Sequence, residues 1–65
     1  MKILTYKVRK EKKITLTQLE AMTGISKTTL NDIENCKVSP KIQQLETIAI
    51  ALGVRITDLF ESEYK

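Results

Sequence analysis

The sequence of 65 residues lacks histidine and tryptophan altogether and contains one cysteine, Cys36. Histidine is the commonest general base and metal ligand, so its absence removes the usual means of acid–base catalysis and metal binding. One cysteine cannot form an intramolecular disulfide, and zinc sites built from several Cys and His side chains are excluded. Paired carboxylates, a nucleophile with its base and a glycine-rich phosphate loop are missing as well. We therefore expect no enzyme, no metal and no cofactor.

Long apolar stretches are also missing. No run approaches the ~20 residues that a membrane-spanning helix needs. Basic residues interrupt the N-terminus, where a signal peptide would have its apolar segment. A lone cysteine suits a reducing compartment. We expect a cytoplasmic protein, complete as it stands, with no membrane partner and no evident small-molecule ligand.

Positive charge is concentrated near the N-terminus. The net charge is +3, yet residues 1–13 hold six basic side chains against Glu11, a local +5, and residues 14–65 hold five basic and seven acidic side chains, a sum of −2. The basic cluster could bind phosphates, or it could be a solvated helix face, which is the commoner case.

Gly24, Pro40 and Gly53 divide the chain into short helical pieces without a linker or repeat. We expect one all-α domain over residues 1–65, with five helices around one core. Its size is near the lower limit for folding without disulfides or bound metals. The first helix runs to about residue 13. Thr15 caps the second, with Gln18 completing a capping box.

The third helix begins at Ser26 and buries Leu30 and Ile33. For the fourth helix, Ser39 is the expected cap and Pro40 the first helical residue. Its apolar stripe is Ile42, Leu45, Ala49 and Leu52, and Gly53 ends it. Thr57 is expected to cap a last helical turn that holds Asp58, Leu59 and Phe60.

Residues 14–35 have the pattern of two helices joined by a sharp turn. Gly24 can take a positive φ at little cost, which allows the turn. The second helix presents short polar side chains at its start and could enter a DNA major groove, ~12 Å wide. Helical hairpins occur in many unrelated proteins, so this spacing alone is only moderately specific.

The wider pattern resembles the lambda-repressor-like family of the xenobiotic-response-element type. The similarity covers nearly the whole chain, in the patterns VRxxKxIT at residues 8–15, Leu19, TGISKxTLxxIEN at residues 23–35, Pro40 and LxxIAxALGV at residues 45–54, where x is a position outside the pattern. It implies a sequence-specific DNA-binding transcription regulator, a repressor, whose helix of about residues 26–35 enters the major groove. The alternative is a protein–protein adaptor or antitoxin-type partner with the same fold.

The resemblance also implies roles for individual residues. The base contacts would be Lys27, Thr28, Asn31 and Asp32. The phosphate contacts would be Thr15, Thr17, Thr29, Asn35 and Lys37, with Ser39 and Lys41 as weaker candidates. Arg9 and Glu34 would form an ion pair that ties the first helix to the third.

Three residues depart from the family pattern. Glu20 stands where many members have a small residue, so its carboxylate must turn to solvent or meet a cation. Cys36 replaces the usual glycine after the third helix, which costs roughly 1–2 kcal/mol if the backbone there is left-handed. Asp32 repels phosphates unless it accepts a hydrogen bond from a cytosine amino group.

One short recognition helix reads too few bases to select a site in a genome. We therefore expect a two-fold homodimer on an inverted repeat with half-sites ~34 Å apart. Strands at residues 2–4 and 62–64 could pair near the interface. Alternatively, Phe60 closes the core of a monomer and dimers form only on DNA. The candidate interface residues are Arg55, Ile56, Phe60, Glu61 and Tyr64.

Overall fold

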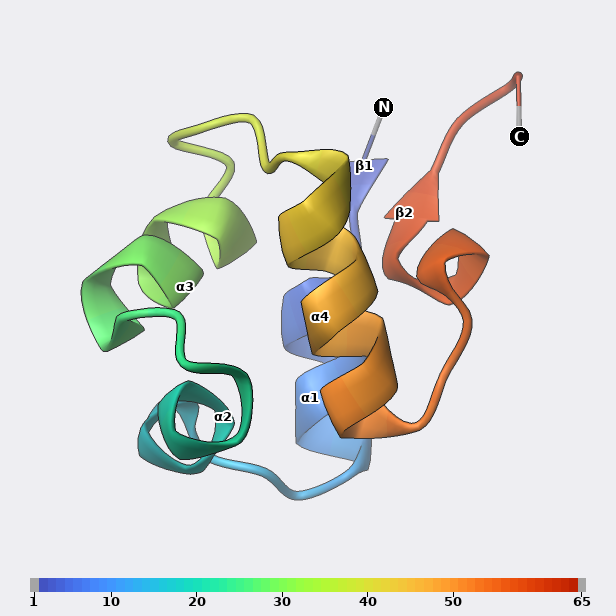
Figure 1. Cartoon of the computed structure of the whole chain (residues 1–65). Helices are drawn as coiled ribbons and strands as arrows, with labels where there is room; N and C mark the ends of the chain where they lie inside the picture. Colours follow the sequence, from blue (N-terminus) through green and yellow to red (C-terminus); the bar gives the residue numbers. More distant parts are fainter. Residues whose placement is uncertain (1, 65) are drawn as a thin grey trace.

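The computed structural model describes residues 2–64. Over this range four α-helices precede a short 3₁₀ helix, η1, and a two-residue strand lies near each end (Figure 1). The elements are β1 (Lys2–Ile3), α1 (Thr5–Glu11), α2 (Leu16–Thr23), α3 (Lys27–Glu34), α4 (Ile42–Leu52), η1 (Ile56–Leu59) and β2 (Phe60–Glu61). The expected all-α fold with five helices is therefore only partly right.

The last helical segment is a 3₁₀ turn, and its cap is not Thr57. The Asp58 carboxylate accepts a hydrogen bond from the Arg55 amide at 3.0 Å, so the turn begins after Arg55. It ends at Leu59, which is completely buried. Phe60, expected in the helix, is extended and starts β2.

The chain ends form a small antiparallel sheet in which Lys2 pairs with Glu61 and Ile3 with Phe60. The expectation that residues 62–64 pair with the N-terminal strand is therefore wrong, because residues 60–61 pair with it instead. The Leu4 amide donates to the carbonyl of Leu59 at 2.8 Å, which places the residues directly after Leu59 beside β1.

The fourth helix starts later than the sequence indicates. Lys41 is its N-cap, with ψ 152°, and its amide donates to the Gln44 side chain at 2.9 Å. The extended backbone at Lys41 keeps Pro40 outside the helix, so Ser39 is not the cap. The other end follows the pattern: Gly53 has φ 69° and closes the helix in a left-handed conformation.

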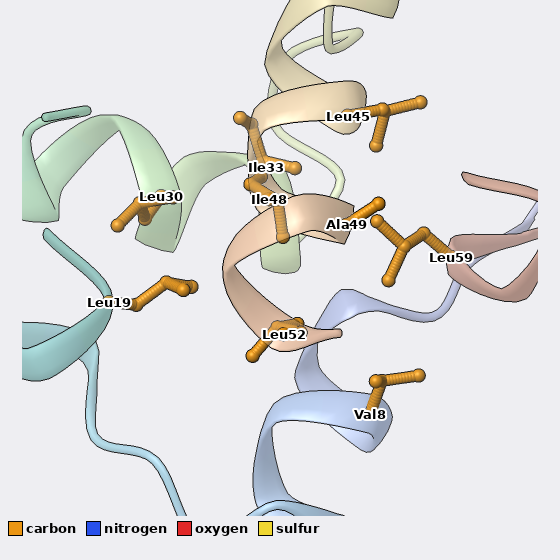
Figure 2. Close-up of a cluster of buried hydrophobic side chains, with 9 residues drawn as sticks. All are labelled: Val8, Leu19, Leu30, Ile33, Leu45, Ile48, Ala49, Leu52 and Leu59. Carbon is orange, nitrogen blue, oxygen red and sulfur yellow. The ribbon is translucent and has the colours of Figure 1, made fainter. Parts of the chain in front are cut away.

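The core lies around α4, which contributes four of its nine buried apolar side chains (Figure 2). The helices α2 and α3 lie on one side of α4, and η1 with the sheet lies on the other (Figure 1). Burial of each large apolar side chain stabilises the fold by about 1.5–3 kcal/mol. The cluster comprises Val8, Leu19, Leu30, Ile33, Leu45, Ile48, Ala49, Leu52 and Leu59.

Candidate nucleic-acid interface

Hydrogen bonds fix the turn between α2 and α3. Gly24 has φ 77°, and its amide donates to the carbonyl of Glu20 at 2.8 Å. An added Cβ at Gly24 would meet no atom within 4 Å, so the backbone angle and not lack of space requires glycine. The Thr23 hydroxyl donates to the Leu19 carbonyl at 2.8 Å and accepts from the Ile25 amide at 3.1 Å. The two helices are therefore joined at a defined angle.

The start of α3 is capped twice. The Ser26 hydroxyl accepts from the Thr29 amide at 3.2 Å, which confirms the expected cap, and donates to the Thr29 hydroxyl at 2.8 Å. The Glu20 carboxylate accepts from the Lys27 amide at 2.8 Å. The sequence led us to expect solvent or a cation around Glu20; the structure instead gives it a backbone amide.

A polar stripe runs along α3 on the face away from the core. Leu30 and Ile33 are buried, and the stripe lies opposite them at the spacing i, i+3, i+4, i+7. Its members are Thr28, Asn31, Asp32 and Asn35, of which only Asp32 is half-buried. Hydroxyl, amide and carboxylate groups of this kind can bond to base edges. Thr29 lies off the stripe, half-buried, with its hydroxyl engaged in the cap.

A hollow of about 450 Å³ opens at the N-terminus of α2. Thr15 caps this helix through the expected capping box: its hydroxyl accepts from the Gln18 amide at 3.1 Å, and the Gln18 side chain accepts from the Thr15 amide at 2.8 Å. Helix N-termini favour anions. The hollow is lined by Arg9, Lys10, Lys13, Ile14, Thr15, Leu16, Thr17 and Lys27.

None of the four cations in this hollow was assigned to it individually from the sequence, and Arg9 was expected only in the ion pair with Glu34. Lys27, expected among the base readers, shares the hollow with the phosphate candidates Thr15 and Thr17. Lys10 and Lys13 received no role from the sequence. The basic cluster in residues 1–13 was the signal in the sequence that could have indicated Lys10 and Lys13. Their position also depends on the left-handed backbone at Lys13, with φ 59°, which turns the chain between α1 and α2 and was not predictable from the sequence.

Arg9 joins α1 to the end of α3. Its Nε donates to Glu34 Oε2 at 2.7 Å and its Nη2 to Oε1 at 3.0 Å, and Nη1 donates to the Ile14 carbonyl at 2.8 Å. The ring of Tyr6 lies 5.3 Å from the guanidinium carbon. The hydrogen bond to Glu34 raises the pKa of Arg9, so the guanidinium stays charged. The ion pair implied by the family resemblance is thus present.

The loop after α3 carries the remaining phosphate candidates. Cys36 has φ 58°, the left-handed conformation that a glycine would adopt more easily. The Lys37 amide donates to the Asp32 carbonyl at 2.9 Å, which holds the loop against α3. Lys37, Ser39 and Lys41 are all exposed.

The candidate dimer residues lie apart from α2 and α3. They belong to η1, β2 and the flanking segments, on the other side of α4 (Figure 1). Ile56 and Phe60 are half-buried and pack against the core, whereas Arg55 and Glu61 are exposed and Tyr64 is 90% exposed.

Residues 2–64 contain no group of three or more carboxylate or thiol side chains that could hold a metal ion. Within the same range no helix has the length and apolar character needed to cross a membrane.

Comparison with known proteins agrees with this geometry. Residues 6–64 match the sequence profile of the Cro/C1-type HTH DNA-binding domain. The chain is also similar to an immunity repressor protein of Bacillus phage phi105, with 36% identity over 56 residues. This alignment covers 86% of the chain but 39% of the relative, so the chain spans about two fifths of that protein's length. The chain belongs to the Cro/C1-type helix-turn-helix family of DNA-binding domains, which is not a family of enzymes.

Proposed function

We propose that this domain binds double-stranded DNA at specific sequences and represses transcription, with α3 in the major groove. The observation that carries the proposal is the position of the polar stripe of α3 next to the cation-lined hollow of α2. A helix that reads base edges needs phosphate contacts beside it to fix its register on the duplex. The similarity to the immunity repressor of a Bacillus phage supports repression in particular.

Each polar group has a place in this arrangement. Thr28, Asn31 and Asp32 face base edges, and Asp32 accepts from a cytosine amino group. Lys27 neutralises a backbone phosphate, because its side chain lines the hollow; this differs from the base contact expected from the sequence. The other phosphate contacts are Thr15, Thr17, Thr29, Asn35, Lys37, Ser39 and Lys41, joined by Lys10 and Lys13.

An adaptor function without DNA fits the exposed surface less well. Adaptors that dock proteins on α3 would need an apolar face there. Among the described residues, the exposed large apolar side chains are Tyr6, Met22, Val38, Ile42, Ile50 and Tyr64, and none lies on α3.

The proposal includes a homodimer on an inverted repeat and a cytoplasmic location. Because Ile56 and Phe60 already pack on the core, their exposed parts would act with Arg55, Glu61 and Tyr64 in the interface. A symmetric dimer doubles the number of bases read.

Selection of bound duplexes from random double-stranded DNA tests the function. We expect enrichment of one sequence with two-fold symmetry and half-sites about one helical turn apart. Recovery of no preferred sequence, with binding that depends only on salt, would contradict sequence-specific regulation.

A further inference from the structure

Glu20 spans the turn of the helix-turn-helix with both its backbone and its side chain. Its carbonyl accepts from the Gly24 amide at 2.8 Å, which ends α2. Its carboxylate accepts from the Lys27 amide at 2.8 Å, which begins α3. One residue of α2 therefore takes part both in the end of α2 and, with the Ser26 cap, in the start of α3.

The neighbouring hydrogen bonds leave little freedom in this segment. Ile25 donates its amide to the Thr23 hydroxyl, and Thr29 donates its amide to the Ser26 hydroxyl. Both of these bonds are local, within three residues along the chain. The bond from Lys27 to Glu20 spans seven residues and links a side chain of α2 directly to the backbone of α3. It thereby ties the start of α3 to α2, in addition to the apolar packing of Leu19 with Leu30 in the core.

The two helix N-termini at the interface also differ in charge. The start of α2 opens on a hollow lined by Arg9, Lys10, Lys13 and Lys27. At the start of α3, the Glu20 carboxylate already accepts the hydrogen bond that the Lys27 amide can donate. A phosphate is attracted to the hollow, and at the start of α3 the Glu20 carboxylate keeps it from the Lys27 amide. The charges thus direct the DNA backbone to the hollow, which Lys27 also lines, and leave no free amide at Lys27 for a phosphate.

We propose that Glu20 is a positioning residue for base recognition, which orients the first turn of α3 so that Thr28 meets its base in one geometry and which keeps phosphates from the Lys27 amide. This inference rests on the proposed function. It assigns a role to the Glu20 carboxylate, which stands at a position where a small side chain would allow α2 and α3 to approach closely.

Two substitutions at Glu20 separate hydrogen bonding from charge. Glu20→Ala removes the acceptor, and Glu20→Gln keeps an acceptor oxygen without the charge. Glu46→Ala and Glu46→Gln are matched controls, because Glu46 is an exposed carboxylate on α4, away from the turn. Binding is measured by fluorescence anisotropy, well below the melting temperature, on the duplex that the wild-type protein selects from random DNA and on its single-base variants.

We expect Glu20→Ala to reduce discrimination about tenfold at the base nearest Thr28 and less than about twofold at the bases nearest Asn31 and Asp32. Glu20→Gln should restore this discrimination and raise affinity for unrelated duplex DNA about threefold, because a negative charge near the phosphates is gone. The Glu46 variants should match the wild type.

A role in stability alone would lower the melting temperature of Glu20→Ala and leave the base preference of the folded protein unchanged, which would overturn the inference. Equal behaviour of the Gln and Ala variants would also overturn it.

Amide hydrogen exchange at Lys27 supplies a readout without DNA: protection should be lost in Glu20→Ala and kept in Glu20→Gln, and unchanged protection in Glu20→Ala would count against the bond. If the wild type itself showed no sequence preference, the proposed function would fail, and this inference with it.

Discussion

Arg9 and Glu34 form a two-point ion pair in which Nε lies 2.7 Å from Oε2 and Nη2 lies 3.0 Å from Oε1. Their side chains are only 8% and 5% exposed. The pair joins α1, whose basic end lines the hollow at the N-terminus of α2, to the end of the proposed recognition helix α3. It therefore keeps the two parts of the interface in a fixed relation.

Removal of one partner should destabilise the fold strongly. Glu34→Ala leaves a buried guanidinium without its carboxylate, and we expect a loss of about 3 kcal/mol in the free energy of unfolding. For a domain of this size the melting temperature should fall by more than about 10 °C. Glu46→Ala, on the exposed face of α4, is the control and should shift it little. A melting temperature unchanged in Glu34→Ala would contradict a structural role for the pair.

Strain at Cys36 should be relieved by glycine. Because its φ is 58°, Cys36→Gly should stabilise the fold by up to roughly 1 kcal/mol, measured by thermal denaturation, without loss of DNA binding. Cys36→Ala removes the thiol but keeps the Cβ, so it should melt like the wild type. If the alanine variant gained as much stability as the glycine variant, the thiol and not the backbone would be responsible.

The cations of the hollow should contribute to the salt dependence of binding. The logarithm of the DNA affinity should fall linearly with the logarithm of salt concentration, with a slope of about 0.9 per neutralised phosphate. Lys10→Ala should reduce this slope by about one such unit. Lys12→Ala is the control, since Lys12 lines a different hollow with Lys7, Glu11, Val54 and Asp58. Equal slopes for the two variants would argue against the hollow as a phosphate site.

The proposed dimer can be tested without DNA. We expect sedimentation at micromolar concentration to show a dimer, and Tyr64→Ala to dissociate it while the fold stays intact, because Tyr64 is 90% exposed. Phe60 packs against the core, so Phe60→Ala should also reduce stability. A monomeric wild-type protein, together with a Phe60→Ala variant that unfolds, would mean that Phe60 closes the monomer and that dimers form only on DNA.

Features determined by neighbours in the chain were predictable from the sequence. The Thr15–Gln18 capping box, the Ser26 cap and the left-handed Gly24 and Gly53 all depend on interactions within a few residues. The Arg9–Glu34 pair lies 25 residues apart in sequence and was accessible only through the family resemblance.

Features that depend on competition between nearby alternatives were not predictable. Ser39–Pro40 is a good helix start, but Lys41 with Gln44 provides another one, and the structure uses it. Burial of Leu59 fixes where η1 ends and hence which residues pair with β1. The amide partner of Glu20 and the place of Lys27 in the hollow depend on the angle between α2 and α3, which no local pattern specifies.

In the proposed complex, α3 reads bases while the residues around it bind phosphates. The most direct test compares Thr28→Ala with Lys37→Ala on the selected duplex and on all its single-base variants. Thr28→Ala should change the preference at one base position by about 1–3 kcal/mol and leave the salt slope unchanged. Lys37→Ala should weaken binding to every sequence about equally and reduce the slope by about one unit. If both variants lost affinity uniformly across sequences, α3 would not be the element that reads the DNA.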